Sequence, residues 1–294
     1  MPMLNPASDV TTIELQLFKL SALVMTLIGV PIILGILWIV WRYRMREGHT
    51  GYDPSFDESA VINKVTFYVP LLTIVALGTL TWVYTHRLDP YRPRTDPAGL
   101  PPYEIQAIAL DYKWLFIYPE AGVATVNELA APAGRAVTIR ISSDPMMTSL
   151  FIPSLVSQIY AMTGMETRAN FLAAAPGEFE GANAMYSGPE FYMQRFKTRI
   201  MTQADFQGWL ASVAAGTMPG ATAAQEPLLD FARYRKLAER TPGAPVMAFT
   251  RVEPALFQTV LRQYEPAYRM NPLPVTIASS PAAAGAVAKP HKGH

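Results

Sequence analysis

The sequence contains no cysteine among its 294 residues. This absence excludes disulfide bonds, thiolate metal ligands and cysteine nucleophiles at once. Thiolates are the soft ligands that select copper in electron-transfer proteins, so an electron carrier of that kind would need other donors here. The redox compartment stays open, because many proteins outside the cytoplasm contain no disulfide.

Charged residues are also scarce, at 16% of the chain, where roughly 25% is usual in soluble proteins. The formal net charge is only +1, which excludes the concentrated basic face that nucleic-acid binding requires. The mean hydropathy is positive. Much of this chain must therefore contact lipid or a partner protein.

Two long runs near the N-terminus, Leu20–Trp41 and Val65–Thr85, contain no charged residue. About 20 apolar residues suffice to cross a bilayer, and prolines such as Pro31 and Pro70 are tolerated inside such helices. A buried core helix is the weaker alternative at this length. The sequence therefore predicts a two-helix transmembrane hairpin within residues 1–95.

The distribution of basic residues orients the hairpin. The segment between the two runs, residues 42–64, carries four lysines and arginines, whereas only Lys19 precedes the first run. Loops rich in lysine and arginine stay in the cytoplasm, and long domains translocate largely regardless of charge. We therefore expect both termini, and everything after about residue 88, to lie outside the cytoplasm. No small-residue cleavage site follows Trp41, so the first run is no secretory signal.

Residues 96–201 are predicted to form a soluble all-β domain. Tyr103–Leu110 and Val137–Ile141 alternate apolar and polar residues, as half-buried strands do. Turn-forming segments separate these and further short strands: Pro119–Gly122, Pro132–Gly134, Ser143–Pro145 and Pro176–Gly177. Short strands at such spacing indicate a β-sandwich or barrel.

Residues 202–268 follow a helical pattern instead. Thr202 and Asp205 resemble a capping box at a helix start. The apolar residues that follow have helical spacing: Phe206, Trp209, Leu210 and Val213. A second helix is expected around residues 226–239, and a third with Pro254 in its first turn. Residues 269–294 are predicted to be a disordered tail.

Four stretches, taken with the hairpin, carry a resemblance to a known family. They are Asp111–Glu120 (DYKWLFIYPE), Thr148–Leu155 (TSLFIPSL), Gln158–Arg168 (QIYAMTGMETR) and Tyr186–Lys197 (YSGPEFYMQRFK). The alternating aromatics of the first stretch, taken by themselves, indicate core packing. In this order and behind this hairpin, the four stretches resemble subunit II of the heme–copper terminal oxidases, over almost the whole chain.

In the copper-bearing branch of that family, the resemblance implies a cupredoxin-like barrel that holds a dinuclear copper centre. Alignment on Pro153–Leu155 places the first histidine ligand of that centre at Thr148. The remaining ligand positions fall on Tyr186, Gly188, Glu190, Gln194 and Lys197. None of the six residues offers a thiolate, imidazole or thioether. We therefore expect no metal, cofactor-binding or catalytic residue in this chain.

A retained scaffold without copper ligands resembles the bo-type ubiquinol oxidase branch. The resemblance implies that hemes, copper and the quinol site belong to subunit I. This chain would then be a non-catalytic subunit that scaffolds and caps subunit I on the periplasmic side. The complex would oxidise ubiquinol, reduce O₂ to water and pump protons, with subunits III and IV and membrane lipid as further contacts.

The sequence departs from that branch at two points. The family usually begins with an acylated cysteine, which this sequence lacks, so a lipoprotein anchor would require an upstream segment. The family also often has a glutamate at the cytoplasmic entrance to the second span, where this chain has Asn63. Our hypothesis is that Glu58 takes the place of that glutamate in proton uptake.

Two other functions compete with this interpretation: a copper-carrying subunit or cupredoxin electron carrier, and a membrane-anchored assembly or binding protein. The methionines at 146, 147, 162 and 165 could suggest thioether ligands, but without Cys or His nearby they indicate adaptable apolar packing. No functional site is assigned to the four histidines: His49, His86, His291 and His294.

Overall fold

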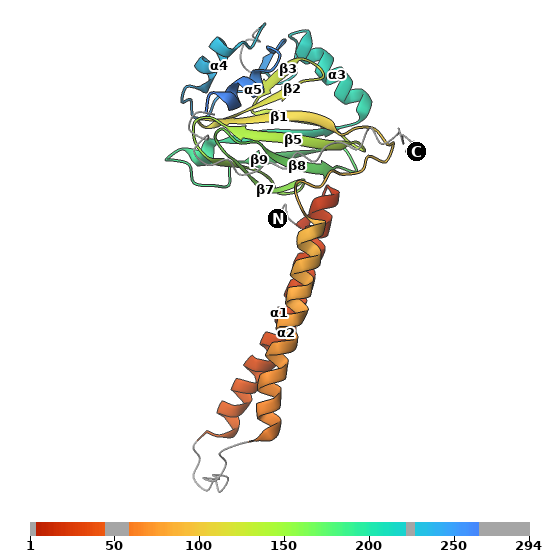
Figure 1. Ribbon diagram of the computed structural model, residues 1–294, viewed down its shortest axis with the longest axis vertical. Coiled ribbons are helices and arrows are strands. Elements are labelled where there is room, and N and C mark those ends of the chain that lie inside the picture. The colour runs from red at the N-terminus through yellow and green to blue at the C-terminus, as the bar shows by residue number, and fades with distance from the viewer. Residues whose placement is uncertain (1–3, 45–58, 222–226, 265–294) are drawn as a thin grey trace, which may run out of the picture.

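The computed structural model describes residues 4–44, 59–221 and 227–264. Two long helices form a stalk, and a β-domain with smaller helices sits at one end of it (Figure 1). The helices are α1 (Asp9–Arg42) and α2 (Ala60–Arg87), both long and apolar enough to cross a membrane. Glu58 and the predicted tail at 269–294 lie outside the described residues.

Each helix of the stalk starts at a serine cap. The Ser8 side chain accepts the Thr11 N–H, and the Thr11 hydroxyl accepts the Ser8 N–H, which completes a capping box. Ser59 caps α2 in the same position. Both helices extend beyond the uncharged runs, because their caps at Ser8 and Ser59 precede the starts of those runs at Leu20 and Val65.

The β-domain consists of two sheets. One has the strand order β11-β3-β2-β1-β5-β8 and the other β4-β10-β9-β6-β7. Most neighbours are antiparallel, but β1 runs parallel to β5 and β10 parallel to β4. The strands are β1 (Tyr103–Leu110), β2 (Lys113–Tyr118), β3 (Val123–Val126), β4 (Glu128–Pro132), β5 (Ala136–Ser143), β6 (Thr148–Ile152), β7 (Val156–Ala161), β8 (Thr167–Leu172), β9 (Gly177–Ala182), β10 (Arg195–Met201) and β11 (Met247–Phe249).

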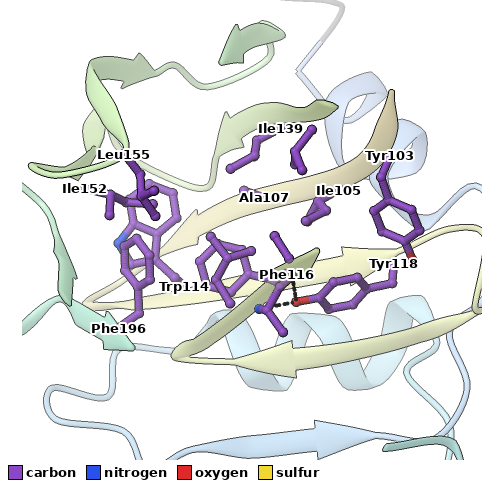
Figure 2. Packing of buried hydrophobic residues seen from close by; sticks show 14 of the residues in the cluster. Tyr103, Ile105, Ala107, Trp114, Phe116, Tyr118, Ile139, Ile152, Leu155 and Phe196 are labelled. Carbon is purple, nitrogen blue, oxygen red and sulfur yellow. Dashed lines mark hydrogen bonds between the residues drawn. The ribbon is translucent and has the colours of Figure 1, made fainter. Parts of the chain in front are cut away.

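Aromatic side chains fill the space between the sheets (Figure 2). Trp114 and Phe116 of β2 are fully buried, and the Phe116 ring lies 5.0 Å from that of Phe196 on the opposite sheet. The Tyr118 hydroxyl accepts the Ala130 N–H at 2.8 Å, and burial raises the pKa of this phenol. The alternating aromatics at 114, 116 and 118 are therefore core residues.

Tyr112 does not share that role. It occupies the turn between β1 and β2 with a φ of 63°, so the strand begins one residue after it. Strand β2 therefore starts at Lys113, and the alternating aromatics on it are Trp114, Phe116 and Tyr118, without Tyr112.

Helix α3 (Gln203–Ala214) begins where its capping residues predicted. The Thr202 hydroxyl accepts the Asp205 N–H at 3.2 Å. The four apolar residues that α3 carries at helical spacing are buried, and the Trp209 ring lies 5.4 Å from that of Tyr118. The helix therefore closes one side of the main core.

The C-terminal region differs in part from the helical pattern. Helices α4 (Phe231–Ala238) and α5 (Leu256–Arg262) form, but strand β11 lies between them and pairs with β3. Helix α5 starts after Pro254 instead of at it, because Ala255 adopts a left-handed conformation at the N-cap. Strand β11 extends the larger sheet, and the two helices pack on the outer face of that sheet and form a second apolar core with it (Figure 1).

Short hydrogen bonds fix the stalk to the β-domain. The Ser8 hydroxyl donates to the Leu155 carbonyl at 2.6 Å. The Asp9 carboxylate accepts the Leu172 N–H at 2.9 Å and pairs with Arg94 at 3.2 Å. The elements described above confirm the predicted fold class: two helices of transmembrane length, an all-β domain and small C-terminal helices.

Candidate functional site

The six positions at which the resemblance places copper ligands differ in how far they are buried. Thr148 and Gln194 are buried, with exposed fractions of 3% and 1%. Tyr186 is 72% exposed, and Lys197 points to solvent from β10. A dinuclear metal centre requires its donors to share one site, whereas this set combines buried and solvent-exposed side chains.

Gln194 is engaged in hydrogen bonds on both sides of its carboxamide. Its Nε2 donates to the carbonyls of Leu110, at 3.0 Å, and Lys113, at 3.3 Å. Its Oε1 accepts Nδ2 of Asn183 at 3.0 Å. The amide just before β10 therefore joins the end of β1, the start of β2 and the loop after β9.

Asn183 extends this contact into a network of neutral groups. Its Nδ2 also donates to the Ser187 hydroxyl at 2.8 Å, and its Oδ1 accepts the Ser149 N–H at 3.1 Å. Asn183, Ser149 and Ser187 are all buried. We call these three residues and Gln194 the amide network. Buried polar groups that find partners in this way stabilise a single arrangement of the loops.

Gly188 cannot be replaced by a side chain that holds a metal. Its φ of +115° lies in the region that disfavours other residues, and an added Cβ would lie 2.3 Å from the Tyr112 hydroxyl. That hydroxyl donates to the Ser187 carbonyl at 3.4 Å. The ring of Tyr112 thus closes the space at this position.

Glu190 is bound to the C-terminal region. Its carboxylate forms an ion pair with Arg240, whose guanidinium lies 5.5 Å from the centre of the Tyr112 ring. Lys197 lies between Glu128 and Glu180 on the neighbouring strands. Both charged side chains therefore have protein groups of opposite charge beside them.

A copper centre does not fit these residues. Copper selects thiolate, thioether and imidazole donors, whereas the amide network offers amides and hydroxyls that already bond one another. Within residues 4–44, 59–221 and 227–264, no group of three or more His, Asp or Glu side chains could hold a metal ion.

Replacing Gln194 by alanine tests the amide network. We expect Gln194→Ala to lower the free energy of unfolding by about 2–4 kcal/mol, since it removes the hydrogen bonds to two carbonyls and to the Asn183 amide and creates a cavity. Lys197→Ala, three residues further along the chain at an exposed position, should change it by less than about 0.5 kcal/mol. Urea denaturation of both variants measures the difference, and equal values would contradict the role of the network.

Lys113 is a buried residue whose importance the sequence did not indicate. It is 2% exposed, and its Nζ donates to the Glu239 carbonyl at 2.8 Å. Burial lowers the pKa of this ammonium, and burial likewise raises the pKa of the nearby Asp111 carboxyl. The only signal in the sequence was a lysine within an otherwise apolar strand. The carbonyl that Lys113 binds, that of Glu239, is far away in the sequence.

Asp144 is the second such residue. Its carboxylate accepts hydrogen bonds from the Tyr234 hydroxyl at 2.7 Å, from Gln263 Nε2 at 3.1 Å and from the Tyr264 hydroxyl. All three donors belong to the C-terminal region. The sequence marks Asp144 only as a turn residue before a proline.

Comparison with known proteins now identifies the family. Residues 223–267, which include these donors, match the family described as COX Aromatic Rich Motif. The cytochrome bo(3) ubiquinol oxidase subunit 2 of Pseudomonas putida is 38% identical over 92% of this chain and 82% of its own length. The chain belongs to the ubiquinol oxidase subunit 2 family.

Other members are similarly close. The corresponding protein of Pseudomonas aeruginosa is 40% identical over 90% of this chain and 77% of its own length. The ubiquinol oxidase subunit 2 of Acetobacter aceti is 37% identical, over 89% and 82%. The predicted resemblance to the quinol branch of subunit II is thus confirmed.

Two solved structures also match, at lower similarity. The periplasmic domain of cytochrome oxidase subunit II (CoxB) of Bradyrhizobium japonicum is 18% identical, covers 41% of this chain and 94% of its own, and gives a TM-score of 0.37. A chain of a heme–copper terminal oxidase dimer is 16% identical, covers 48% and 99%, and gives a TM-score of 0.38.

Proposed function

We propose that this chain is the copper-free subunit II of a proton-pumping ubiquinol oxidase. The complex oxidises ubiquinol and passes the electrons to O₂, which is reduced to water. The observation that carries the proposal is the chemistry of the six ligand positions. None of them offers a thiolate, imidazole or thioether, and Gln194 is bonded into the amide network instead. Electrons therefore enter the complex without passing through this chain.

In this proposal the hemes, the copper and the quinol site belong to subunit I. This chain contributes a membrane hairpin and a periplasmic domain that scaffolds and caps subunit I. The names of the relatives, which are subunits of ubiquinol oxidases, support this assignment. Subunits III and IV and membrane lipid are the further contacts that we propose.

The proposed orientation places both termini in the periplasm of a bacterium. It is supported by the basic residues between the two helices, which favour a cytoplasmic loop. It is also supported by the hydrogen bonds of Ser8 and Asp9, which hold the β-domain at the end of the stalk opposite to the last residues of α1 and the first residues of α2 (Figure 1).

A copper-carrying electron carrier is the main competing function, and the chemistry of Gln194 and its partners argues against it. An assembly or binding protein outside any respiratory complex is the other competing function. A protein of that kind would be purified without heme.

Purification from membranes in mild detergent distinguishes these functions. We expect hemes and quinol-oxidising activity to co-purify with this chain at constant ratio through successive columns. Emergence of the chain free of heme would contradict the proposal and favour the assembly protein. The absorption or paramagnetic signal of a dinuclear copper centre would instead favour the electron carrier.

A further inference from the structure

Two adjacent loops of the β-domain bring four methionines together. Residues 144–147 join β5 to β6, and residues 162–166 join β7 to β8. The Thr163 hydroxyl donates to the Pro145 carbonyl at 2.9 Å and so links the two loops. Thr148 pairs with Ala161 in the antiparallel register, which places the preceding Met147 next to Met162.

These methionines and a neighbouring tyrosine form an exposed apolar surface. Met146, Met147 and Tyr160 are 39%, 36% and 46% exposed. We define the methionine surface by five residues: Met146, Met147, Tyr160, Met162 and Met165. Single exposed apolar side chains are ordinary, but a gathered set marks a contact site. Methionine is frequent in adaptable binding surfaces, because its side chain is flexible and polarizable.

The methionine surface lies on the membrane side of the domain, away from the stalk. Strand β7 runs along the underside of the domain, across the direction of the helices (Figure 1). The stalk contacts the domain at Ser154 and Leu155, just before β7. Met162 follows Leu155 by seven residues, which is about 20 Å along a strand. This end of β7 therefore overhangs the membrane beside the hairpin.

The charge of the surface distinguishes a protein partner from lipid headgroups. Residues 144–147 and 160–165 contain no lysine or arginine, and basic residues are what attract anionic lipid. The adjoining carboxylate of Glu166 is already paired with Arg140 and Arg168. An uncharged, apolar and adaptable surface is suited to the apolar surface of another protein.

We propose that the methionine surface docks this domain onto the membrane-embedded subunit of the oxidase that lies beside the hairpin. The inference rests on the proposed function, because that function supplies such a partner. It assigns the contact to five residues that lie outside the amide network.

The C-terminal region positions two of the five residues of this surface, Met146 and Met147. Asp144 directly precedes the segment Pro145–Met147, and its carboxylate holds the hydroxyls of Tyr234 and Tyr264. The aromatic-rich motif therefore fixes the loop that carries Met146 and Met147. Asp144 acts as a positioning residue, since its own side chain faces the C-terminal region.

Variants in the full complex test the docking. Met146→Ser combined with Met147→Ser should reduce the heme retained per copy of this chain about tenfold, the factor that corresponds to about 1.4 kcal/mol of binding. Met146→Leu with Met147→Leu should retain it. Leu100→Ser with Leu228→Ser is the matched control, because these residues are 53% and 39% exposed elsewhere on the domain. Equal heme retention in the serine variant and the control overturns the inference.

A photo-crosslinker identifies the partner directly. With p-benzoylphenylalanine in place of Tyr160, we expect a cross-link to the heme-bearing subunit, and Asp144→Asn should lower its yield at an unchanged level of this chain. A cross-link to lipid, or none, in a complex that still contains heme overturns the inference and leaves the proposed function standing. Recovery of the wild-type chain without heme contradicts the proposed function itself.

Discussion

A chain that ends at residue 221 should not accumulate in the membrane. This truncation removes the segment 227–264, which covers the outer face of the larger sheet. Four large apolar side chains of that face would become exposed: Ile108, Leu110, Leu115 and Ile117. Strand β11 would also be lost, which leaves the edge of β3 unpaired.

The expected loss is comparable to the whole stability of a domain. Burying one such side chain contributes about 1.5–3 kcal/mol, so four contribute about 6–12 kcal/mol. A folded domain is stable by only about 5–15 kcal/mol. The truncated domain is therefore expected to unfold and to be degraded.

Immunoblotting of membranes measures this effect. A chain that ends at residue 268 is the control, because it keeps the aromatic-rich motif and removes only the predicted tail. Normal accumulation of the chain that ends at 221, together with co-purified heme, would show that the motif has no structural role.

Replacing Trp114 by alanine should lower the free energy of unfolding by about 3–5 kcal/mol, the usual cost of emptying a buried aromatic site. Trp114 is fully buried, and its ring lies 6.2 Å from Phe116 and 5.7 Å from Phe196 (Figure 2). Chemical denaturation of the detergent-purified chain measures the loss. Tyr186→Ala, at a 72% exposed position, should change it by less than about 0.5 kcal/mol.

Trp114→Phe separates core packing from electron transfer. The indole Nε1 makes no hydrogen bond within the described residues, so phenylalanine costs only part of the packing. We expect this variant to keep the quinol-oxidising rate of the complex. A large fall in that rate at unchanged heme content would indicate that the ring takes part in electron transfer.

The hairpin and much of the sandwich could be predicted because their signals are local. Uncharged runs of transmembrane length mark α1 and α2, and the capping pair of Thr202 and Asp205 marks the start of α3. The alternating aromatics from Trp114 to Tyr118 indicated a buried face, which the structure confirms. Strand β11 was not foreseen, because three residues carry little pattern and the strand depends on β3 for its hydrogen bonds.

The sequence by itself determined that this chain supplies no thiolate and has two segments long and apolar enough to cross a membrane, since composition and length decide both. Only the tertiary structure decided what stands at the copper-ligand positions. Gln194 meets Asn183, and Asp144 meets Tyr234, through contacts between segments far apart in sequence. Such pairs leave no local pattern, because hydrogen bonds between distant segments form only when the sheets and the C-terminal region pack together.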